Sequence, residues 1–326
     1  SGSDATNFSV VRVKSDVLRR SNVGMILTRR SPSAFGEDSN VAYGADANLL
    51  FFDNLRLTGF YSRSSTTGID GNEQSYQAKL DYDSDRYGLQ AEVLGVGDAF
   101  RPEVGFVLRD DFQRTFASGR FSPRLTSNRH IRQLTWEASF DRFVSGADVL
   151  ETRQEKGTFS VEFNSSDEFS LEVSRNFESL DEGFPVADLF IPAGNYSFYE
   201  VMGELQLGPH RRVSGSVSFN TGGFFGGDRS GLGYTGRVKL SSQLALEPRV
   251  SLDWISQPEA HRRVTLTGVR STLTITPRMY VAALVQYNSS TGALETNARW
   301  RWEFEPGSDL FIVYTDGRDT VGRGFS

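Results

Sequence analysis

Residues 297–304 read NARWRWEF, so that Ala298 and three aromatic residues alternate with polar or charged ones. Successive side chains of a β-strand point to opposite faces, and such a stretch therefore has one oily face and one polar face. The same alternation runs through residues 41–51, 76–83, 133–140, 169–174, 212–219 and 232–240. Its repetition predicts an all-β protein whose strands are apolar on one face and polar on the other.

Composition agrees with strands and excludes helical membrane spans. The 326 residues are 38% hydrophobic and 12% aromatic, with 25 Phe and 32 Gly. No stretch approaches the roughly 18 to 20 consecutive apolar residues that a transmembrane helix needs. A transmembrane barrel is hidden in such averages, because only every second residue of a strand faces lipid. A modest hydrophobic content is therefore no argument against a membrane location.

A soluble β-sandwich would alternate too, and it is the main structural alternative. Three features favour a barrel in lipid instead. The alternating segments run about 9 to 13 residues, enough to cross a bilayer at a tilt, whereas ordinary strands have about 5 or 6. No segment is apolar on both faces, as a large soluble core would demand. Aromatic residues also collect near strand ends, where interfacial girdles lie. We therefore expect one domain over residues 1–326, an antiparallel up-and-down transmembrane β-barrel.

The connections between the expected strands alternate in length. Short links such as FDN at 52–54 follow odd-numbered strands, and long ones such as RSSTTGIDG at 63–71 or TGGFFGGDRSG at 221–231 follow even-numbered strands. Tight periplasmic turns that alternate with long external loops are typical of outer-membrane barrels. The expected strands, about eighteen, cover residues 7–15, 20–29, 40–51, 54–63, 73–82, 85–95, 110–122, 131–143, 151–163, 167–178, 195–207, 209–220, 231–241, 244–255, 262–275, 277–289, 293–305 and 308–317.

Some details of this assignment are expected to be irregular. Pro248 cannot donate a ladder hydrogen bond, so we expect a local break there. The alternation between Thr265 and Ile275 changes phase midway, which indicates a β-bulge, and the phase of 110–122 is ambiguous. Because the long loops would place both ends of this array on the external side, we also expect a barrel that is incomplete at both ends, in a parent of about 20 or 22 strands.

Few features of the sequence point to an enzyme. The absence of cysteine excludes disulfides and thiolate chemistry, and a net charge of −6 with scattered basic residues disfavours nucleic-acid binding. The three histidines lie in separate expected turns, and the acidic stretches near Asp70 and at 178–188 lack the full ligand spacing of a calcium site. GLGYTG at 231–236 matches a dinucleotide-binding glycine motif, but an alternating strand follows it where a helix is required. We expect no catalytic residue, metal or cofactor.

The polar faces of the expected strands carry acids and bases that would line a barrel interior. Two such carboxylates could in principle act as a glycosidase pair. The favoured interpretation is that these charges stay hydrated, pair across strands and set solute selectivity. The candidate lumen-lining residues are Lys79, Asp81, Glu92, Glu137, Glu172, Glu204, Arg212, Arg237, Lys239, Arg249, Asp253, Arg299, Arg301 and Glu303.

One long link is unusually apolar for a surface loop. It reads ESLDEGFPVADLFIPAGNYSFY at 178–199, and Phe184, Phe190 and Ile191 are its candidate functional residues. They would form an inward constriction or dock a partner. The alternative is an ordered external loop with a small apolar cluster of its own.

Three stretches resemble a known family. ATNFSVVRVKSDVLRRSNVGMILTRR at 5–30, FRPEVGFVLRDDFQRTFASGRFSPR at 100–124 and NARWRWEFEPGSDLFIVYTDGRDT at 297–320 look like the barrel region of the bacterial outer-membrane proteins grouped as domain of unknown function 5916. The resemblance spans nearly the whole chain and implies an outer-membrane β-barrel. Members of that family typically carry a module similar to carbohydrate-binding module family 9 ahead of the barrel, which is absent from these residues. The family has no established catalytic motif in the barrel.

The leading functional hypothesis is passage or uptake of a polar solute, with carbohydrate as the class hinted at by the family, through an outer-membrane barrel of a Gram-negative bacterium. One alternative is a barrel that anchors a carbohydrate-binding module or delivers it to the surface. Another is a subunit of a larger outer-membrane assembly. The expected partners are outer-membrane lipid, an oligosaccharide, and other outer-membrane or periplasmic proteins, with no nucleic acid among them.

Overall fold

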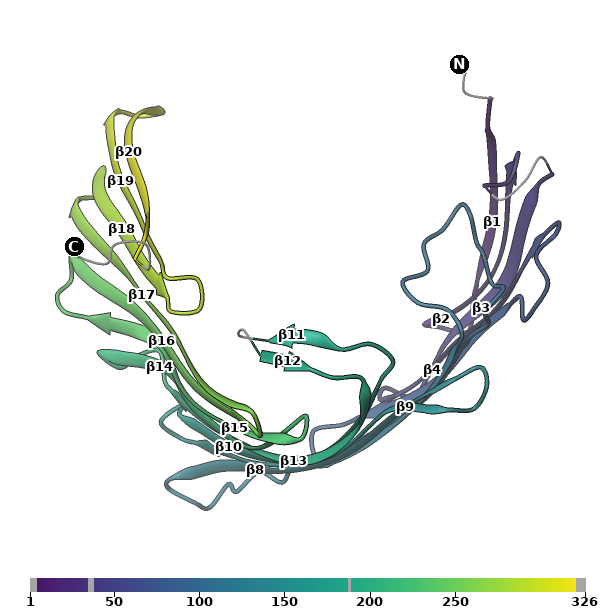
Figure 1. Cartoon of the computed structure of the whole chain (residues 1–326), viewed down its shortest axis with the longest axis horizontal. Coiled ribbons are helices and arrows are strands. Elements are labelled where there is room, and N and C mark those ends of the chain that lie inside the picture. The colour runs from purple at the N-terminus through teal and green to yellow at the C-terminus, as the bar shows by residue number, and fades with distance from the viewer. Residues whose placement is uncertain (1–4, 35–37, 187–188, 321–326) are drawn as a thin grey trace. The chain divides into compact units, whose positions relative to one another are not determined.

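A computed structural model of the chain describes residues 5–34, 38–186 and 189–320. Within these residues the protein is built of strands, without a helix (Figure 1). The strands are β1 (Asn7–Val17), β2 (Ser21–Ser31), β3 (Asn40–Phe51), β4 (Leu55–Thr66), β5 (Gln74–Asp83), β6 (Tyr87–Val96), β7 (Phe112–Phe121), β8 (Ile131–Ser145), β9 (Leu150–Phe163), β10 (Glu168–Leu180), β11 (Phe184–Val186), β12 (Leu189–Ile191), β13 (Gly194–Leu207), β14 (Val213–Phe224), β15 (Gly227–Lys239), β16 (Leu244–Gln257), β17 (Ala260–Thr276), β18 (Met279–Asn288), β19 (Ala293–Glu305) and β20 (Ser308–Asp319).

The topology is antiparallel and up-and-down. Neighbours in the chain pair with each other from β1 to β8 and again from β13 to β20, and β9 pairs with β10. These strands belong to one 18-stranded sheet, and β11 and β12 form a separate hairpin. Closure of the sheet into a ring is not detected among the described residues. The prediction of an all-β, up-and-down array is thus confirmed, and barrel closure stays a prediction.

By its contacts the chain divides into two compact units. Unit 1 comprises residues up to Pro123 together with Trp136–Gly157 and Asn176–Ser179. Unit 2 comprises Arg124–Thr135, Thr158–Arg175 and the residues from Leu180 on.

In unit 1, strand register fixes which side chains share a face. Residues directly opposite each other in an antiparallel pair point to the same side. One row across β4 to β8 therefore consists of Leu57, Leu80, Ala91, Ala117 and Phe140. The neighbouring row, on the opposite face, consists of Thr58, Lys79, Glu92, Phe116 and Asp141. Register thus separates an apolar face from a largely polar one.

The same separation holds in unit 2. The apolar row runs across seven strands and the polar row lies next to it on the other face. The apolar row is Leu205, Val217, Tyr234, Val250, Thr267, Tyr287 and Leu294. The polar row is Gln206, Ser216, Thr235, Arg249, Gly268, Gln286 and Glu295.

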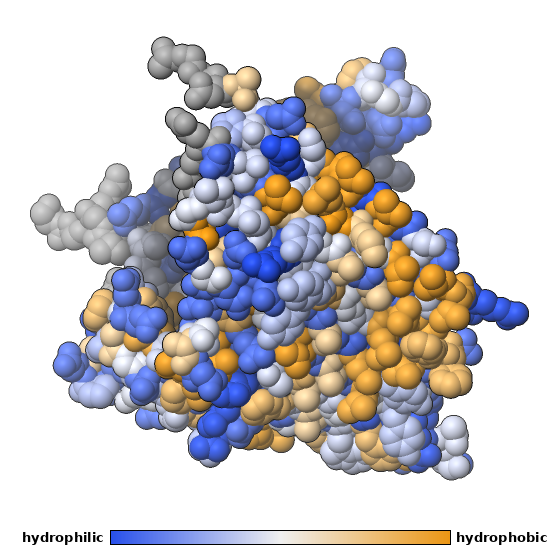
Figure 2. All heavy atoms as spheres, turned by 90° about the vertical axis from the view of Figure 1, so that its right-hand side faces the viewer, coloured by the Kyte–Doolittle hydropathy of each residue, from blue (hydrophilic) through white to orange (hydrophobic). Residues whose placement is uncertain are grey.

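The apolar face of unit 1 is open to its surroundings. Met25 is 69% exposed, Val13 64% and Leu89 53%, although all three are large hydrophobic residues. Figure 2 shows orange side chains gathered in a diagonal band over the N-terminal strands, with blue residues on either side of it. Hydrophobic side chains gathered in this way on a sheet face lack a protein partner within the described chain.

Two expectations about particular segments are wrong, and a third is right in part. Arg212 does not lie on a strand, since β14 begins at Val213. The expected long loop TGGFFGGDRSG is a tight turn at Phe225 and Gly226, because β14 extends to Phe224 and β15 starts at Gly227. The bulge expected between Thr265 and Ile275 exists, at the end of that segment, where the register of β17 with β18 shifts between Thr274 and Thr276. The register of β16 with β17 is unbroken through residues 260–273, so the mixed phase there reflects Val264 and Leu266 on the polar face.

The break expected at Pro248 exists on one side of its strand only. Pro248 is in register with Val269 on β17. Toward β15 the paired positions run from Thr235 opposite Arg249 directly to Val238 opposite Leu246. Pro248 has no N–H, so it cannot donate a ladder hydrogen bond to β15, which accounts for the missing pairs on this side.

Candidate functional site

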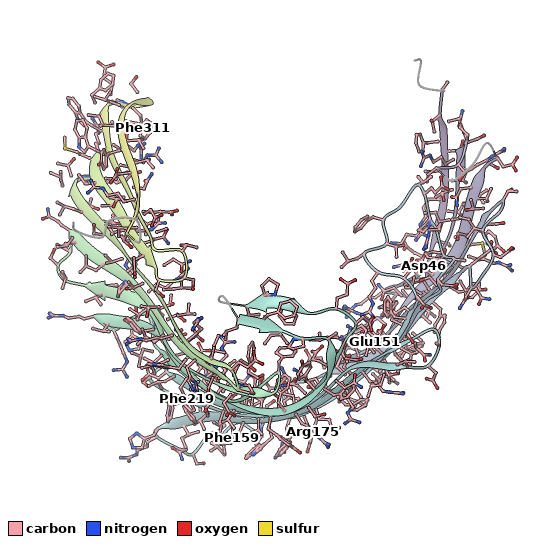
Figure 3. The ribbon with its side chains drawn as sticks, in the orientation of Figure 1. Asp46, Glu151, Phe159, Arg175, Phe219 and Phe311 are labelled. Carbon is pink, nitrogen blue, oxygen red and sulfur yellow. The ribbon has the colours of Figure 1, made fainter. Side chains whose placement is uncertain are left out.

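The polar face of unit 1 is an array of ion pairs across neighbouring strands. Arg12 on β1 meets Asp46 on β3 at 2.5 Å, and Figure 3 labels Asp46 on its strand. Arg114 donates from Nε and Nη2 to the two carboxylate oxygens of Asp141 at 2.8 and 2.7 Å. Bidentate pairs of this kind hold both side chains in one geometry. The charges of this face therefore largely neutralise one another.

The polar face of unit 2 also carries pairs near its edges. Arg229 donates from Nε and Nη2 to Asp253 Oδ1 at 3.1 and 2.7 Å. Arg301 donates from Nε and Nη2 to the two carboxylate oxygens of Asp309 at 2.8 and 3.0 Å. Arg299 lies over the ring of Phe311, with 4.4 Å from its guanidinium carbon to the ring centroid. An arginine over an aromatic face is attracted by the negative face of the ring.

A hollow lies in unit 2 at the gap beside Pro248. Its volume is about 440 Å³ and its charged lining consists of Arg237, Glu247, Arg249 and Arg270. Polar lining residues are Gln206, Ser214, Thr235 and Gln286. We call this hollow the Pro248 pocket. A second hollow of about 460 Å³ shares Arg249, Gly268 and Gln286 with it and adds Glu295.

The apolar link between β10 and β13 forms the hairpin β11–β12, which Figure 1 draws across one face of β13. Phe184 of the hairpin meets the ring of Phe225 edge-on at 5.5 Å between centroids. Phe225 also contacts Tyr196 and Phe198, at 5.4 Å in each case. Tyr196 and Phe198 share the side of β13 that bears Glu200 and Glu204, because every second residue of a strand points the same way. The hairpin therefore sits on the polar face of unit 2.

The three loop candidates have different environments. Ile191 is 1% exposed, Phe190 is 67% exposed, and Phe184 is anchored on Phe225. Phe184 belongs to a small aromatic cluster with Phe225, Tyr196 and Phe198, and both alternatives for this link, an inward constriction or partner dock and an external loop with its own cluster, stay predictions. The sequence gives no sign of the anchor itself, because Phe225 sits in what reads as a glycine-rich loop.

A polar clamp joins two turns of unit 2. Asp167, before β10, accepts hydrogen bonds from Arg211 Nε at 2.9 Å, from the Gly208 backbone N–H at 2.8 Å and from Ser165 Oγ at 2.8 Å, and Arg211 Nη2 donates to its other oxygen as well. The Arg211 side chain, and then the Gly208 and Ser165 donors, hold the pKa of the Asp167 carboxyl well below its usual range. Asp167 in turn raises the pKa of Arg211.

A second polar cluster holds the link between β6 and β7 to the strand ends of unit 1. Asn40 is fully buried and donates from Nδ2 to Thr66 Oγ1 and to the Arg101 carbonyl, each at 2.7 Å. Glu103, with a side chain 4% exposed, accepts from Ser33 Oγ at 2.5 Å and from the Ala34 N–H at 2.6 Å. The link is therefore an ordered strap, although the sequence predicts only a long loop there.

The predicted lumen-lining residues divide between the two units. Lys79 and Asp81 lie on β5, Glu92 on β6 and Glu137 on β8. Register places all four on the polar face of unit 1. Glu204, Arg237, Lys239, Arg249, Asp253, Arg299, Arg301 and Glu303 lie on β13, β15, β16 and β19 of unit 2, on the polar side in each case. Glu172 lies on β10, and Arg212 lies in the turn before β14.

Arg270 is not among the residues predicted from the sequence, because an expected phase change leaves the orientation of its strand open. Register places Arg270 directly opposite Glu247. The Arg12–Asp46 pair and the Asp167 clamp are not predicted either, since a cross-strand partner cannot be identified before register is known. Of the predicted residues, the structure brings Arg237 and Arg249 together at the Pro248 pocket.

Searches for other chemistry and for relatives give negative findings. The described residues contain no group of three or more His, Cys, Asp or Glu side chains placed to hold a metal ion. They contain no helix long and apolar enough to cross a membrane. No family model matches the chain, and no curated protein matches it. The family resemblance therefore stays a proposal that rests on the three quoted stretches.

Proposed function

We propose that this chain is the membrane-spanning β-barrel part of a bacterial outer-membrane protein, and that it passes a polar solute across that membrane. The carrying observation is the separation of faces by register. In unit 1 the row Leu57, Leu80, Ala91, Ala117 and Phe140 lies beside the polar row that contains Lys79, Glu92 and Asp141.

The exposed apolar face supports a lipid environment. Soluble monomers rarely expose contiguous apolar patches of more than a few hundred Å². Here large hydrophobic residues such as Val13, Met25 and Leu89 are more than half exposed on one face. The hydrocarbon chains of lipids would shield this apolar face from water. Because the strands are hydrogen-bonded to their neighbours, few backbone N–H and C=O groups would lack a partner in lipid. Outer-membrane lipid is therefore the proposed surrounding.

The polar faces support passage of a hydrophilic solute. Paired and unpaired charges of both signs lie on them, together with Ser, Thr and Gln side chains. Such a lining keeps water and offers hydrogen bonds without an apolar barrier. A barrel of eighteen or more strands is too wide for side chains alone to fill. Carbohydrate is the solute class that the family resemblance favours.

The hairpin β11–β12 favours a second candidate, in which the barrel anchors a carbohydrate-binding module or delivers it to the surface without conducting. The hairpin covers part of the polar face of unit 2, where Phe184 is held by Phe225. A segment folded over a polar face is how wide barrels are plugged. In this form the protein would act with other outer-membrane or periplasmic proteins.

Single-channel recording in planar lipid bilayers separates the two candidates. The folded chain, purified in detergent, is added at fixed salt, and heat-unfolded protein in the same detergent is the control. Discrete, ion-selective open steps are the result expected for solute passage. Folded protein that inserts into vesicles but stays electrically silent would overturn passage and leave the anchoring function.

A further inference from the structure

We propose that the Pro248 pocket of unit 2 is a binding site for the anionic group of a polar solute, such as the carboxylate of an acidic sugar. The inference deepens the proposed function by naming a charge class for the solute. It stands on the pocket itself, on the charges in it and on the absence of neutralising partners for them.

The pocket exists because the backbone opens at Pro248 and few side chains fill the space. Pro248 interrupts pairing with β15, as the missing register positions between Arg249 and Leu246 record. Beside it, a Cβ on Gly215 would lie 2.2 Å from the Gly236 Cα, so a side chain at this position would force the backbone to move. Gly268, on the polar row next to Arg249, adds no side chain either. The result is the hollow of about 440 Å³.

The charges in the pocket do not balance. Three arginines, Arg237, Arg249 and Arg270, face one carboxylate, Glu247. Arg237 reaches Glu247 at 3.9 Å, and both side chains are about half exposed, at 52% and 43%. An ion pair so long and so exposed is weak. Among the described residues, no ion pair or hydrogen bond is found for the guanidinium of Arg249 or Arg270.

Three other arginines of the polar faces are each matched to an acid. Arg114, Arg229 and Arg301 each donate two hydrogen bonds to a single aspartate. Arg249 and Arg270, by contrast, keep their planar set of donors open, which is the geometry that recognises carboxylate, phosphate or sulfate. The adjoining hollow offers Glu295 as its one acid, at the side away from Arg237.

The remaining lining fits hydroxyl groups near the anionic group. Gln206, Gln286, Thr235 and Ser214 provide donors and acceptors around the arginines. Leu284, opposite Arg270 in the register of β17 and β18, gives a small apolar patch of the kind on which a sugar ring can lie. An acidic oligosaccharide satisfies the arginines and these amide and hydroxyl groups together, whereas a bare anion satisfies only the arginines.

The test is isothermal titration of the folded full chain in detergent at low salt, with trigalacturonate as the probe and its fully methyl-esterified form as the uncharged match. We expect trigalacturonate to bind at least tenfold more tightly than the ester. Arg249→Gln and Arg270→Gln should each weaken trigalacturonate binding about tenfold or more. Arg263→Gln removes the same charge from the same strand but on the opposite face, where Arg263 is in register with Trp254, and it should leave the affinity unchanged.

Glu247→Gln is the decisive variant, because it removes the only acid of the pocket and should tighten trigalacturonate binding. A variant that merely disturbed the fold would weaken it. Equal binding of acid and ester, unchanged affinity in both arginine variants, or weaker binding by Glu247→Gln would each overturn the proposal. Because the titration needs no conduction, a barrel that is silent in planar bilayers but binds trigalacturonate as described would refute solute passage alone, and a conducting barrel without this binding would refute the anion site alone.

Discussion

Leu80 and Gln77 lie on the same strand, three residues apart, and register places them on opposite faces of β5. Leu80 is opposite Leu57 and Ala91, in the apolar row. Gln77 is opposite Phe60 and Leu94 and donates from Nε2 to Glu92 at 2.8 Å. A charge at these two positions should therefore have different effects in a membrane.

Leu80→Arg should lower the free energy of unfolding by about 2–4 kcal/mol in lipid vesicles if this strand crosses a bilayer near its middle. Gln77→Arg should be tolerated, because the new guanidinium lies next to Glu92. Urea titrations of both variants in the same vesicles measure the difference. The reverse order of stabilities would mean that the apolar face is not the lipid face.

Asp167 allows a prediction of pH dependence. Its folded pKa is lowered by Arg211, Gly208 and Ser165, so folding is favoured by the ionised form. The stabilisation is present above the pKa of an unfolded aspartate, about 3.9, and is lost as the pH falls through the lower folded pKa. Asp167→Asn should therefore be less stable than the natural chain at pH 7 and approach it at strongly acidic pH. Unfolding midpoints recorded from pH 7 downward test this, and a constant difference at all pH values would contradict the clamp.

At the scale of elements, the alternating strands were predictable and the short hairpin was not. Each of the eighteen expected strands has a counterpart, because an alternation over ten or more residues is a local signal that needs no partner. β11 and β12 have three residues each, too few to show a period. They are held by the contact between the rings of Phe184 and Phe225, which lies more than thirty residues away in the chain.

Phe225 also shows why the turn before β15 was misread as a loop. Phe225 and Gly226 both have positive φ, 46° and 84°, as a tight two-residue hairpin turn requires. Asn-Gly is the usual sequence for such a turn, and a bulky residue with positive φ is uncommon. The four rings around Phe225, those of Phe184, Tyr196, Phe198 and Phe224, provide the packing that offsets this strain.

Phe225→Asn separates the two roles of this residue. It keeps a turn of the favoured Asn-Gly type but removes the ring that holds the hairpin. We expect the overall fold to remain and residues 181–186 to lose protection in hydrogen–deuterium exchange. Phe190→Ser, at the exposed position of the hairpin, is the control and should leave the exchange unchanged. Unaltered protection in Phe225→Asn would show that the cluster does not hold the hairpin.

At the scale of the whole molecule, the sequence predicts which residues share a face but not which charges meet. The alternation of side chains along each strand predicts that Arg237 and Arg249 lie on the polar side, and the register of β15 with β16 agrees. The grouping of these two with Arg270 around Glu247 depends on the register of β15, β16 and β17 and on the gap at Pro248. Register is a property of strand pairs, so it cannot be read from one strand alone. The same reason hides the Arg12–Asp46 pair, whose two strands are separated by β2.

A scan along β5 in lipid vesicles can show whether the apolar faces meet lipid and the polar faces meet water. The chain has no cysteine, so single cysteines at residues 76–82 can each carry one nitroxide spin label. Relaxation by oxygen, which concentrates in lipid, is compared with relaxation by a water-soluble nickel complex. We expect oxygen to dominate at Tyr76, Ala78, Leu80 and Tyr82, and nickel to dominate at Gln77, Lys79 and Asp81. Accessibility without a two-residue period, or nickel dominant at all seven positions, would contradict the claim.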